Sequence, residues 1–123
     1  MSGNKVFLDT NIILYLLGGD KTIAELLNGK LFYISFITQL ELLGFPGLDS
    51  KQEEIIKDLL SKCVILDIND DIKSRVIHLR KTKKLKLPDC IIIASSLYLN
   101  LPIITADEDS KKVDELNLIL YER

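Results

Sequence analysis

The stretch Val6-Phe7-Leu8-Asp9-Thr10-Asn11 joins a short apolar run to an acidic residue and then to a segment with helical spacing. This pattern predicts a buried strand followed at once by a helix, with Asp9 at the turn between them. In the simplest interpretation, capping this helix is the only role of Asp9. It could also point into the crevice at the carboxyl end of the sheet, where α/β folds bind their ligands. The two roles are compatible.

The rest of the chain repeats this alternation of short apolar runs and longer segments with helical period. The predicted strands are Lys5–Leu8, Leu31–Ser35, Val64–Ile68, Pro102–Thr105 and Leu118–Leu120. The predicted helices are Thr10–Leu17, Thr22–Asn28, Ile37–Leu43, Lys51–Lys62, Asp70–Lys83, Asp89–Leu99 and a short one near Ser110–Leu116. Such alternation predicts an α/β fold, a three-layer α/β/α sandwich around a mostly parallel sheet of about five strands.

Local signals refine three of the predicted helices. Ser50-Lys51-Gln52-Glu53 is interpreted as a capping box, and Asn69 as the N-cap of the next helix. The helix Asp89–Leu99 is apolar on nearly every side. We therefore expect it to be covered on more than one face, by the sheet and by a neighbouring helix or a second subunit.

Length and composition predict a single globular domain over residues 1–123. Hydrophobic residues make up 47% of the chain and charged residues 28%, a balance that argues against disorder. The net charge of −2 provides no overall attraction to nucleic acid. Binding to a nucleic acid would therefore depend on a local basic patch, or on metal ions that bridge to phosphate.

Several features predict a cytoplasmic protein without a membrane segment. Cys63 and Cys90 lie in apolar stretches and lack the spacing of a disulfide or zinc site. The N-terminal stretch Met1–Lys5 has no signal-peptide pattern, and no apolar run approaches membrane-spanning length.

Glu41 and Asp89 are acidic residues in strongly apolar surroundings. Glu41 is the only ionisable residue of the segment Phe36–Gly44, which we predict to be a largely buried helix. A buried carboxylate is costly, so Glu41 should have a basic partner or a metal ion. Asp89 follows a proline at the start of an apolar helix, where the helix dipole favours an acid. Because its neighbours are apolar, Asp89 also needs a compensating cation.

Asp107 begins the acidic cluster Asp107-Glu108-Asp109, which taken alone is typical of a solvated turn. Its position directly after an apolar run favours Asp107 as the member that faces inward. Parallel strands bring their carboxyl ends to one edge of the sheet, where two carboxylates about 4 Å apart repel by roughly 4 kcal/mol at an effective dielectric near 20. Divalent cations would remove this conflict, and acids without His or Cys favour Mg²⁺ or Mn²⁺ over Zn²⁺.

Three segments together resemble the PIN-domain family, and more narrowly the VapC-type toxins of toxin–antitoxin pairs. They are FLDTNIILYLL (7–17), ITQLELLG (37–44) and KLKLPDCIIIASSLYLNLPIITADED (84–109), and the resemblance runs from about Val6 to Tyr121. It implies that Asp9, Glu41, Asp89 and Asp107 are catalytic and bind metal. Thr10, Asn11 and Thr105 match polar support positions, and Thr38 is assigned to the same group. This chain departs from the family at Cys90 and Ser96, often Ala there, and at Ser110, often aromatic.

The resemblance implies a metal-dependent endoribonuclease that uses Mg²⁺ or Mn²⁺ and cuts RNA, commonly tRNA or rRNA. The expected products carry a 5′-phosphate and a 3′-hydroxyl. The resemblance also implies a homodimer and a cognate antitoxin, which would lay an extended or helical peptide over the apolar helices and offer a basic residue to the acidic pocket.

A basic run leads directly to Asp89. It consists of Arg80, Lys81, Lys83, Lys84 and Lys86. By itself the run is best explained as a solvated helix end, where cations complement the helix dipole. Beside a metal pocket it becomes a candidate track for RNA phosphates.

Other functions fit the residues less well. A haloacid-dehalogenase-type phosphatase needs a second Asp two residues after the first, and Asn11 stands at that position. The metal-free ribonuclease mechanism that uses a pair of histidines is excluded, because His78 is the only histidine and is predicted to face solvent. An RNA-binding or regulatory PIN-like domain without turnover, and a structure-specific DNA nuclease, remain as alternatives.

Overall fold

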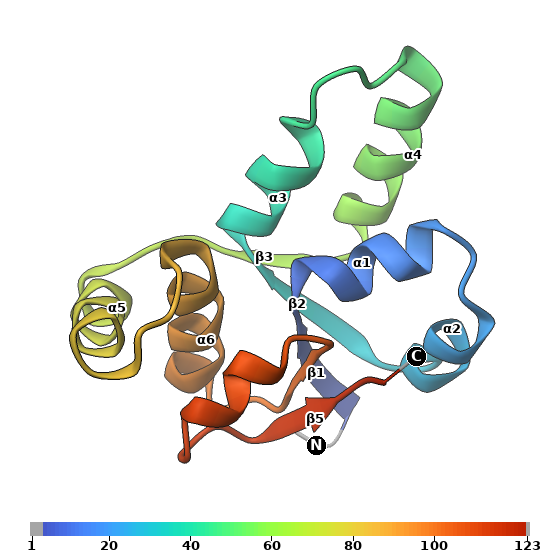
Figure 1. Cartoon of the computed structure of the whole chain (residues 1–123). Helices are drawn as coiled ribbons and strands as arrows, with labels where there is room; N and C mark the ends of the chain where they lie inside the picture. Colours follow the sequence, from blue (N-terminus) through green and yellow to red (C-terminus); the bar gives the residue numbers. More distant parts are fainter. Residues whose placement is uncertain (1–3, 123) are drawn as a thin grey trace.

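A computed structural model describes residues 4–122 as five β-strands, six α-helices and one short 3₁₀ helix (Figure 1). Residues 1–3 and 123 lie outside the described part, and with them most of the N-terminal stretch in which no signal-peptide pattern was found. The strands are β1 (Lys5–Leu8), β2 (Leu31–Ser35), β3 (Val64–Leu66), β4 (Ile103–Thr105) and β5 (Leu118–Leu120). The helices are α1 (Thr10–Leu17), α2 (Lys21–Leu27), α3 (Phe36–Leu43), α4 (Ser50–Ser61), α5 (Asp70–Lys83), α6 (Leu87–Leu99) and the 3₁₀ helix η2 (Glu108–Lys112).

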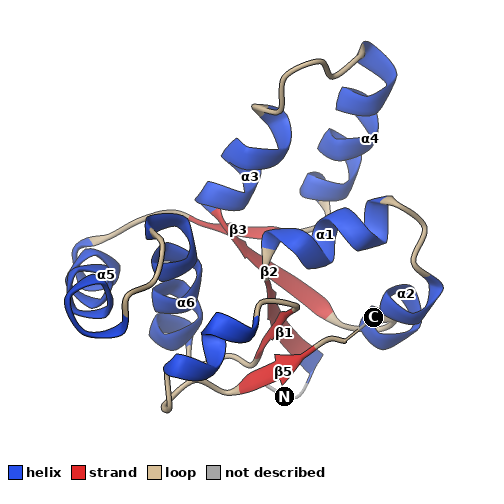
Figure 2. Ribbon diagram, viewed as in Figure 1, coloured by secondary structure: helices blue, strands red, loops and turns tan. Residues whose placement is uncertain are grey.

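The five strands form one sheet in the order β3-β2-β1-β4-β5, and every neighbouring pair is parallel (Figure 2). The predicted α/β/α fold is therefore confirmed. The strand order reverses at β1, which pairs with β2 on one side and with β4 on the other. Ligands of open α/β sheets bind at such a reversal, outside the carboxyl ends of the strands. The residues that follow β1 and β4 therefore border the expected crevice.

Helices cover both faces of this sheet, because successive side chains of each strand point to opposite faces. Val6 and Leu8 pack with α1–α4, whereas Phe7 packs with α5 and α6. Figure 1 shows α5 and α6 side by side on one flank of the sheet, while α3 and α4 rise above it as a hairpin. Gly44 ends α3 in a tight turn, where a Cβ would lie 2.6 Å from the Leu40 carbonyl oxygen.

Helix α6 is enclosed within the chain. All residues from Cys90 to Ser96 are buried, against the sheet on one side and α5 on the other. The predicted cover on more than one face is thus supplied by α5, and a second subunit is not required for it. Cys63 and Cys90 are both free thiols, as predicted.

The start of α4 corrects one prediction. The capping box consists of Asp49 and Gln52, not Ser50 and Glu53. The Asp49 side chain accepts a hydrogen bond from the Gln52 N–H at 2.7 Å, and the Gln52 side chain accepts one from the Asp49 N–H at 3.1 Å. Asp and Gln fill the two positions as well as Ser and Glu do, so the pattern could be placed one residue early. The predicted N-cap Asn69 is confirmed, because its side chain accepts from the Ile72 N–H at 2.8 Å.

None of the helices within residues 4–122 is both long enough and apolar enough to cross a membrane.

Candidate metal centre

Asp9 lies between β1 and α1, with only 8% of its surface exposed. One carboxylate oxygen accepts a hydrogen bond from the Thr10 N–H at 2.7 Å, and the other accepts one from the Thr105 hydroxyl at 2.5 Å. The Thr105 hydroxyl oxygen in turn accepts from the Asp107 N–H at 3.0 Å. Asp9 is therefore both the N-cap of α1 and a bridge that holds the ends of β1 and β4 together.

Asp107 and Asp89 approach the same place from different elements. Asp107 is half-buried and caps η2 by accepting a hydrogen bond from the Asp109 N–H at 3.0 Å. Its neighbours Glu108 and Asp109 are exposed and form surface ion pairs with lysines of the same turn. Asp89 is also half-buried and lies in the first turn of α6.

A small hollow brings three of the four predicted acids together. It is lined by Asp9, Asp89, Ile92, Ile93, Ile103, Asp107 and Ser110. The carboxylates thus come from the ends of β1 and β4 and from the start of α6, at the point where the strand order reverses. This is the edge of the sheet at which the sequence predicted that they would meet.

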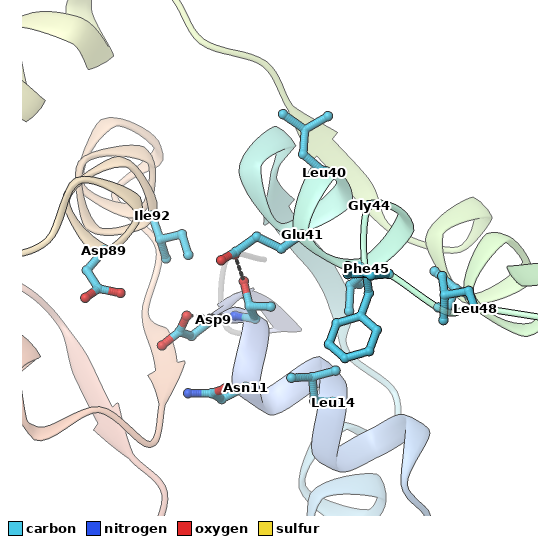
Figure 3. A pocket seen from close by; sticks show the side chains of 14 residues that line it. Asp9, Asn11, Leu14, Leu40, Glu41, Gly44, Phe45, Leu48, Asp89 and Ile92 are labelled. Atoms are coloured by element: carbon cyan, nitrogen blue, oxygen red, sulfur yellow. Dashed lines mark hydrogen bonds between the residues drawn. The ribbon is translucent and has the colours of Figure 1, made fainter. Parts of the chain in front are cut away.

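Glu41 corrects a second prediction, because its side chain is exposed and α3 is only partly buried, at Thr38 and Leu42. Its carboxylate accepts a hydrogen bond from the Thr10 hydroxyl at 2.8 Å (Figure 3). The Thr10 and Thr38 hydroxyl oxygens are 2.9 Å apart. Because Thr10 has a single hydroxyl proton and directs it to Glu41, Thr38 donates to Thr10. The two threonines therefore orient Glu41 toward the other acids.

A larger groove of about 550 Å³ adjoins the hollow, and Asp9 and Asp89 line both. Figure 3 shows Glu41 and Asn11 at its acidic end and Leu14, Phe45 and Leu48 farther along it. The apolar part of its wall is formed by Leu14, Leu40, Leu42, Phe45, Pro46, Leu48, Ile56 and Ile92. Leu40 is 57% exposed and Phe45 67% exposed. This groove was not predicted from the sequence, although the exposed Leu40 directly precedes Glu41 in the chain.

The acids repel one another, as their pKa values show. Burial is the main cause that raises the pKa of Asp9, and the charges of Asp107 and Glu41 add to it, while hydrogen bonds from Thr105 and Thr10 oppose it. Burial and the charges of Asp107 and Asp9 raise the pKa of Asp89 to about 6, and nearby Lys86 opposes this shift. A cation bound among these carboxylates would offset the repulsion.

The chemistry of the donor set fits a hard divalent cation. Carboxylate oxygens line the hollow, and its wall includes no His or Cys side chain. Oxygen ligands of this kind suit Mg²⁺ or Mn²⁺. Within residues 4–122, no three or more His, Cys, Asp or Glu side chains lie in a ready-made metal-binding arrangement. The carboxylates would therefore have to adjust their side chains around an ion.

The basic run lies along the end of α5 and the loop before α6. Lys81, Lys84 and Lys86 are exposed. Arg80 has a structural contact, because its guanidinium donates to the Leu85 carbonyl oxygen at 2.8 Å and supports this loop. Lys86 is the member closest to the acids along the chain, as the N-cap residue of α6. His78 is exposed, as predicted.

A parallel sheet with carboxylates gathered where its strand order reverses defines an α/β domain with an acidic ligand crevice. The chain belongs to the PIN-domain family, whose model matches residues 6–116. The match agrees with the acidic segments that suggested this family from the sequence.

Solved structures support the narrower assignment to the VapC type. One chain of a toxin–antitoxin complex from Klebsiella pneumoniae has 32% sequence identity to this chain. The TM-score is 0.83, and the match covers 96% of this chain and 99% of that one. VapBC-1 from nontypeable Haemophilus influenzae is 25% identical, with a TM-score of 0.78 over 94% of this chain and 97% of that one. VapBC2 from Rickettsia felis, bound to a DNA fragment from its promoter, shares the fold at 22% identity, with a TM-score of 0.78 over 96% of this chain and 99% of that one. No curated protein sequence matches the chain. The family and these neighbours support a nuclease toxin, a hydrolase that acts on nucleic acid.

Proposed function

We propose that this chain is a metal-dependent endoribonuclease, the toxin of a toxin–antitoxin pair, and that Asp9, Glu41, Asp89 and Asp107 hold Mg²⁺ or Mn²⁺. The observation that carries the proposal is the hollow shared by three carboxylates, with Glu41 in the adjoining groove. When bound, the cation supplies positive charge for the scissile phosphate and lowers the pKa of a water that attacks it. The RNA products would carry a 5′-phosphate and a 3′-hydroxyl.

The polar residues around the acids have positioning roles in this proposal. Hydrogen bonds from Thr10 and Thr105 fix both oxygens of Asp9. The Thr10 and Thr38 hydroxyls hold Glu41, which completes the coordination or orients the water. Asn11 is exposed at the acidic end of the groove, where its amide can contact the substrate.

Cleavage of purified tRNA and rRNA with Mn²⁺, with Mg²⁺ and with EDTA tests this proposal. We expect cleavage that requires the metal, and end-mapping of the fragments should show 5′-phosphates. RNA binding without cleavage in any metal would instead identify a regulatory domain. Cleavage of structured DNA with intact RNA would identify a DNA nuclease.

Replacing two exposed lysines of the basic run should weaken RNA binding. In the variant Lys81→Glu/Lys84→Glu we expect several-fold weaker binding, because two phosphate contacts are lost. Each such contact adds about 0.7 to the salt dependence of single-strand binding, so its slope should fall by about 1.4. The measurement is fluorescence anisotropy with labelled RNA at several salt concentrations. Lys86 is retained, because it modulates the charge of Asp89.

A matched control carries the same change of charge elsewhere. Lys21 and Lys51 are exposed residues in the first turns of α2 and α4, where acids are tolerated well. The Lys21→Glu/Lys51→Glu variant should bind RNA nearly as the wild type does. Equal losses in both variants would mean that net charge alone controls binding and that the basic run is only a solvated helix end.

The proposed antitoxin fits the groove beside the acids. An apolar wall that ends at Asp9, Glu41 and Asp89 suits a peptide whose apolar side chains lie along it while a basic side chain reaches the carboxylates. Leu40→Asp should weaken capture of the cognate antitoxin by roughly 30-fold or more, because it places a charge in the apolar contact. The measurement is the affinity of the purified wild type and of the variant for the cognate antitoxin.

Leu26→Asp is the control for the antitoxin experiment. Leu26 is an exposed leucine of α2 and does not line the groove. Its replacement should leave antitoxin capture unchanged. If Leu40→Asp also left it unchanged, the antitoxin would have to bind another surface.

A homodimer and a cytoplasmic location belong to the same proposal. Because α5 already covers α6, the dimer has no support from the apolar character of that helix. Size-exclusion chromatography with light scattering would determine the oligomeric state. The free thiols of Cys63 and Cys90 are compatible with a reducing compartment.

A further inference from the structure

Ser110 is a buried serine whose hydroxyl has no hydrogen-bond partner in the described part of the chain. Only 4% of the residue is exposed, and it lines the hollow together with Asp9, Asp89 and Asp107. Its backbone N–H donates to the Asp107 carbonyl oxygen at 3.2 Å, which holds the residue beside that acid. Within residues 4–122, the Ser110 hydroxyl forms no hydrogen bond.

Ser110 lines the same hollow as the three carboxylates. A hydroxyl oxygen that accepts no hydrogen bond from the protein keeps its lone pairs free for another partner, such as water or a cation. No completely enclosed side-chain oxygen or nitrogen of the described residues lacks a partner. The Ser110 oxygen is therefore not completely enclosed, and the residue borders the hollow that also holds the three carboxylates.

We propose that the Ser110 hydroxyl is an additional oxygen of the cation site, alongside Asp9, Asp89 and Asp107. This inference rests on the proposed function, because it presupposes a divalent cation in the hollow. Mg²⁺ prefers about six oxygen ligands, so the three carboxylates leave coordination positions for other oxygens. Three carboxylates already exceed the charge of one divalent cation. A neutral hydroxyl adds an oxygen without increasing their repulsion.

Direct binding of Mn²⁺ to Ser110→Ala tests this inference. The dissociation constant, measured by electron paramagnetic resonance or calorimetry, should rise about tenfold, the lower end of the 10–100-fold range for polar groups that support a metal site. The control is Ser95→Ala, which removes another buried hydroxyl. Ser95 donates to the Ile91 carbonyl oxygen at 2.7 Å and does not line the hollow. Its variant should bind Mn²⁺ with wild-type affinity.

The melting temperature of the metal-free protein separates cation binding from a structural role. Because the Ser110 hydroxyl forms no hydrogen bond with any described residue, Ser110→Ala should melt at or slightly above the wild-type temperature without metal. A lower melting temperature without metal, together with unchanged Mn²⁺ affinity, would make Ser110 structural and overturn the inference. A wild-type protein that binds no Mn²⁺ would overturn the proposed function as well, whereas equal affinity in wild type and variant overturns this inference alone.

Discussion

Asp9→Asn should yield a folded protein that cleaves no RNA. Asn is as good an N-cap as Asp, so its side-chain oxygen can still accept the hydrogen bond from Thr10 that begins α1. The Thr105 hydroxyl can rotate to accept from the new amide group. The negative charge in the hollow is lost, however. Changes that merely affect the support of a metal ligand cost 10–100-fold, so loss of a ligand should lower the cleavage rate by more than about 100-fold.

The measurement is the rate of RNA cleavage with Mn²⁺, beside the circular dichroism spectrum and melting temperature of the metal-free protein. Removing a buried charge should not lower that melting temperature, because burial disfavours the charged form of Asp9. Asp109→Asn is the matched control, since Asp109 is an exposed acid of the same cluster as Asp107. It should cleave at the wild-type rate. Residual cleavage by Asp9→Asn at that rate would refute the proposed site.

Much of the fold could be predicted, because turn residues and helix caps mark where many of its strands and helices begin and end. The bounds of β1, β2, β5, α1 and α5 agree with the prediction, since turn residues or helix caps lie directly beside them. Helix α6 begins at Leu87, two residues earlier than predicted, because Pro88 is tolerated in a first helical turn, where its missing N–H costs nothing. The segment after Asp107 forms a 3₁₀ helix earlier than the predicted one, which short periodic patterns do not distinguish from an α-helix.

The candidate site was predicted less completely than the fold. Strand ends identified Asp9 and Asp107, because parallel strands bring such residues to one edge. Glu41 was expected to be buried, since apolar residues such as Leu40 and Leu42 surround it in the sequence. Leu42 is buried but Leu40 faces the groove. The apolar lining of a binding groove has the same sequence pattern as a core, so sequence alone could not separate the two. The role proposed for Ser110 could not be predicted from the sequence either, because it depends on the residues that line the hollow with it.

Mn²⁺ should stabilise the protein strongly at pH 7.5 and much less at pH 5. The folded-state pKa of Asp89, about 6, lies above its ordinary value of 3.8, so between these values the folded protein holds a proton that the unfolded chain has released. The free energy of unfolding of the metal-free protein should therefore fall as pH rises from about 4 to 6. The raised pKa of Asp9 acts in the same direction.

With Mn²⁺ present, the free energy of unfolding should instead rise with pH, because the metal binds only the ionised carboxylates. At 100 times the dissociation constant a ligand adds about 2.7 kcal/mol, which for a domain of this size raises the melting temperature by about 10 °C. At pH 5 a proton on Asp89 weakens Mn²⁺ binding by about tenfold, so the same Mn²⁺ concentration should raise the melting temperature by roughly half as much or less. Differential scanning fluorimetry at both pH values measures these shifts.

Two variants show whether Asp89 is the cause. Asp89→Asn removes one of the two groups with a raised pKa, so the pH dependence of the metal-free protein between pH 4 and 6 should become weaker, and Mn²⁺ should no longer raise its melting temperature. Asp114→Asn removes an exposed acid outside the hollow and should behave as the wild type does. A Mn²⁺ shift that is equal at both pH values, or that persists in Asp89→Asn, would place the ion away from these carboxylates. The closeness of the acids therefore has two effects: without metal the site binds protons more readily, and above pH 6 it favours a divalent cation. In each case a positive charge relieves the repulsion between the carboxylates.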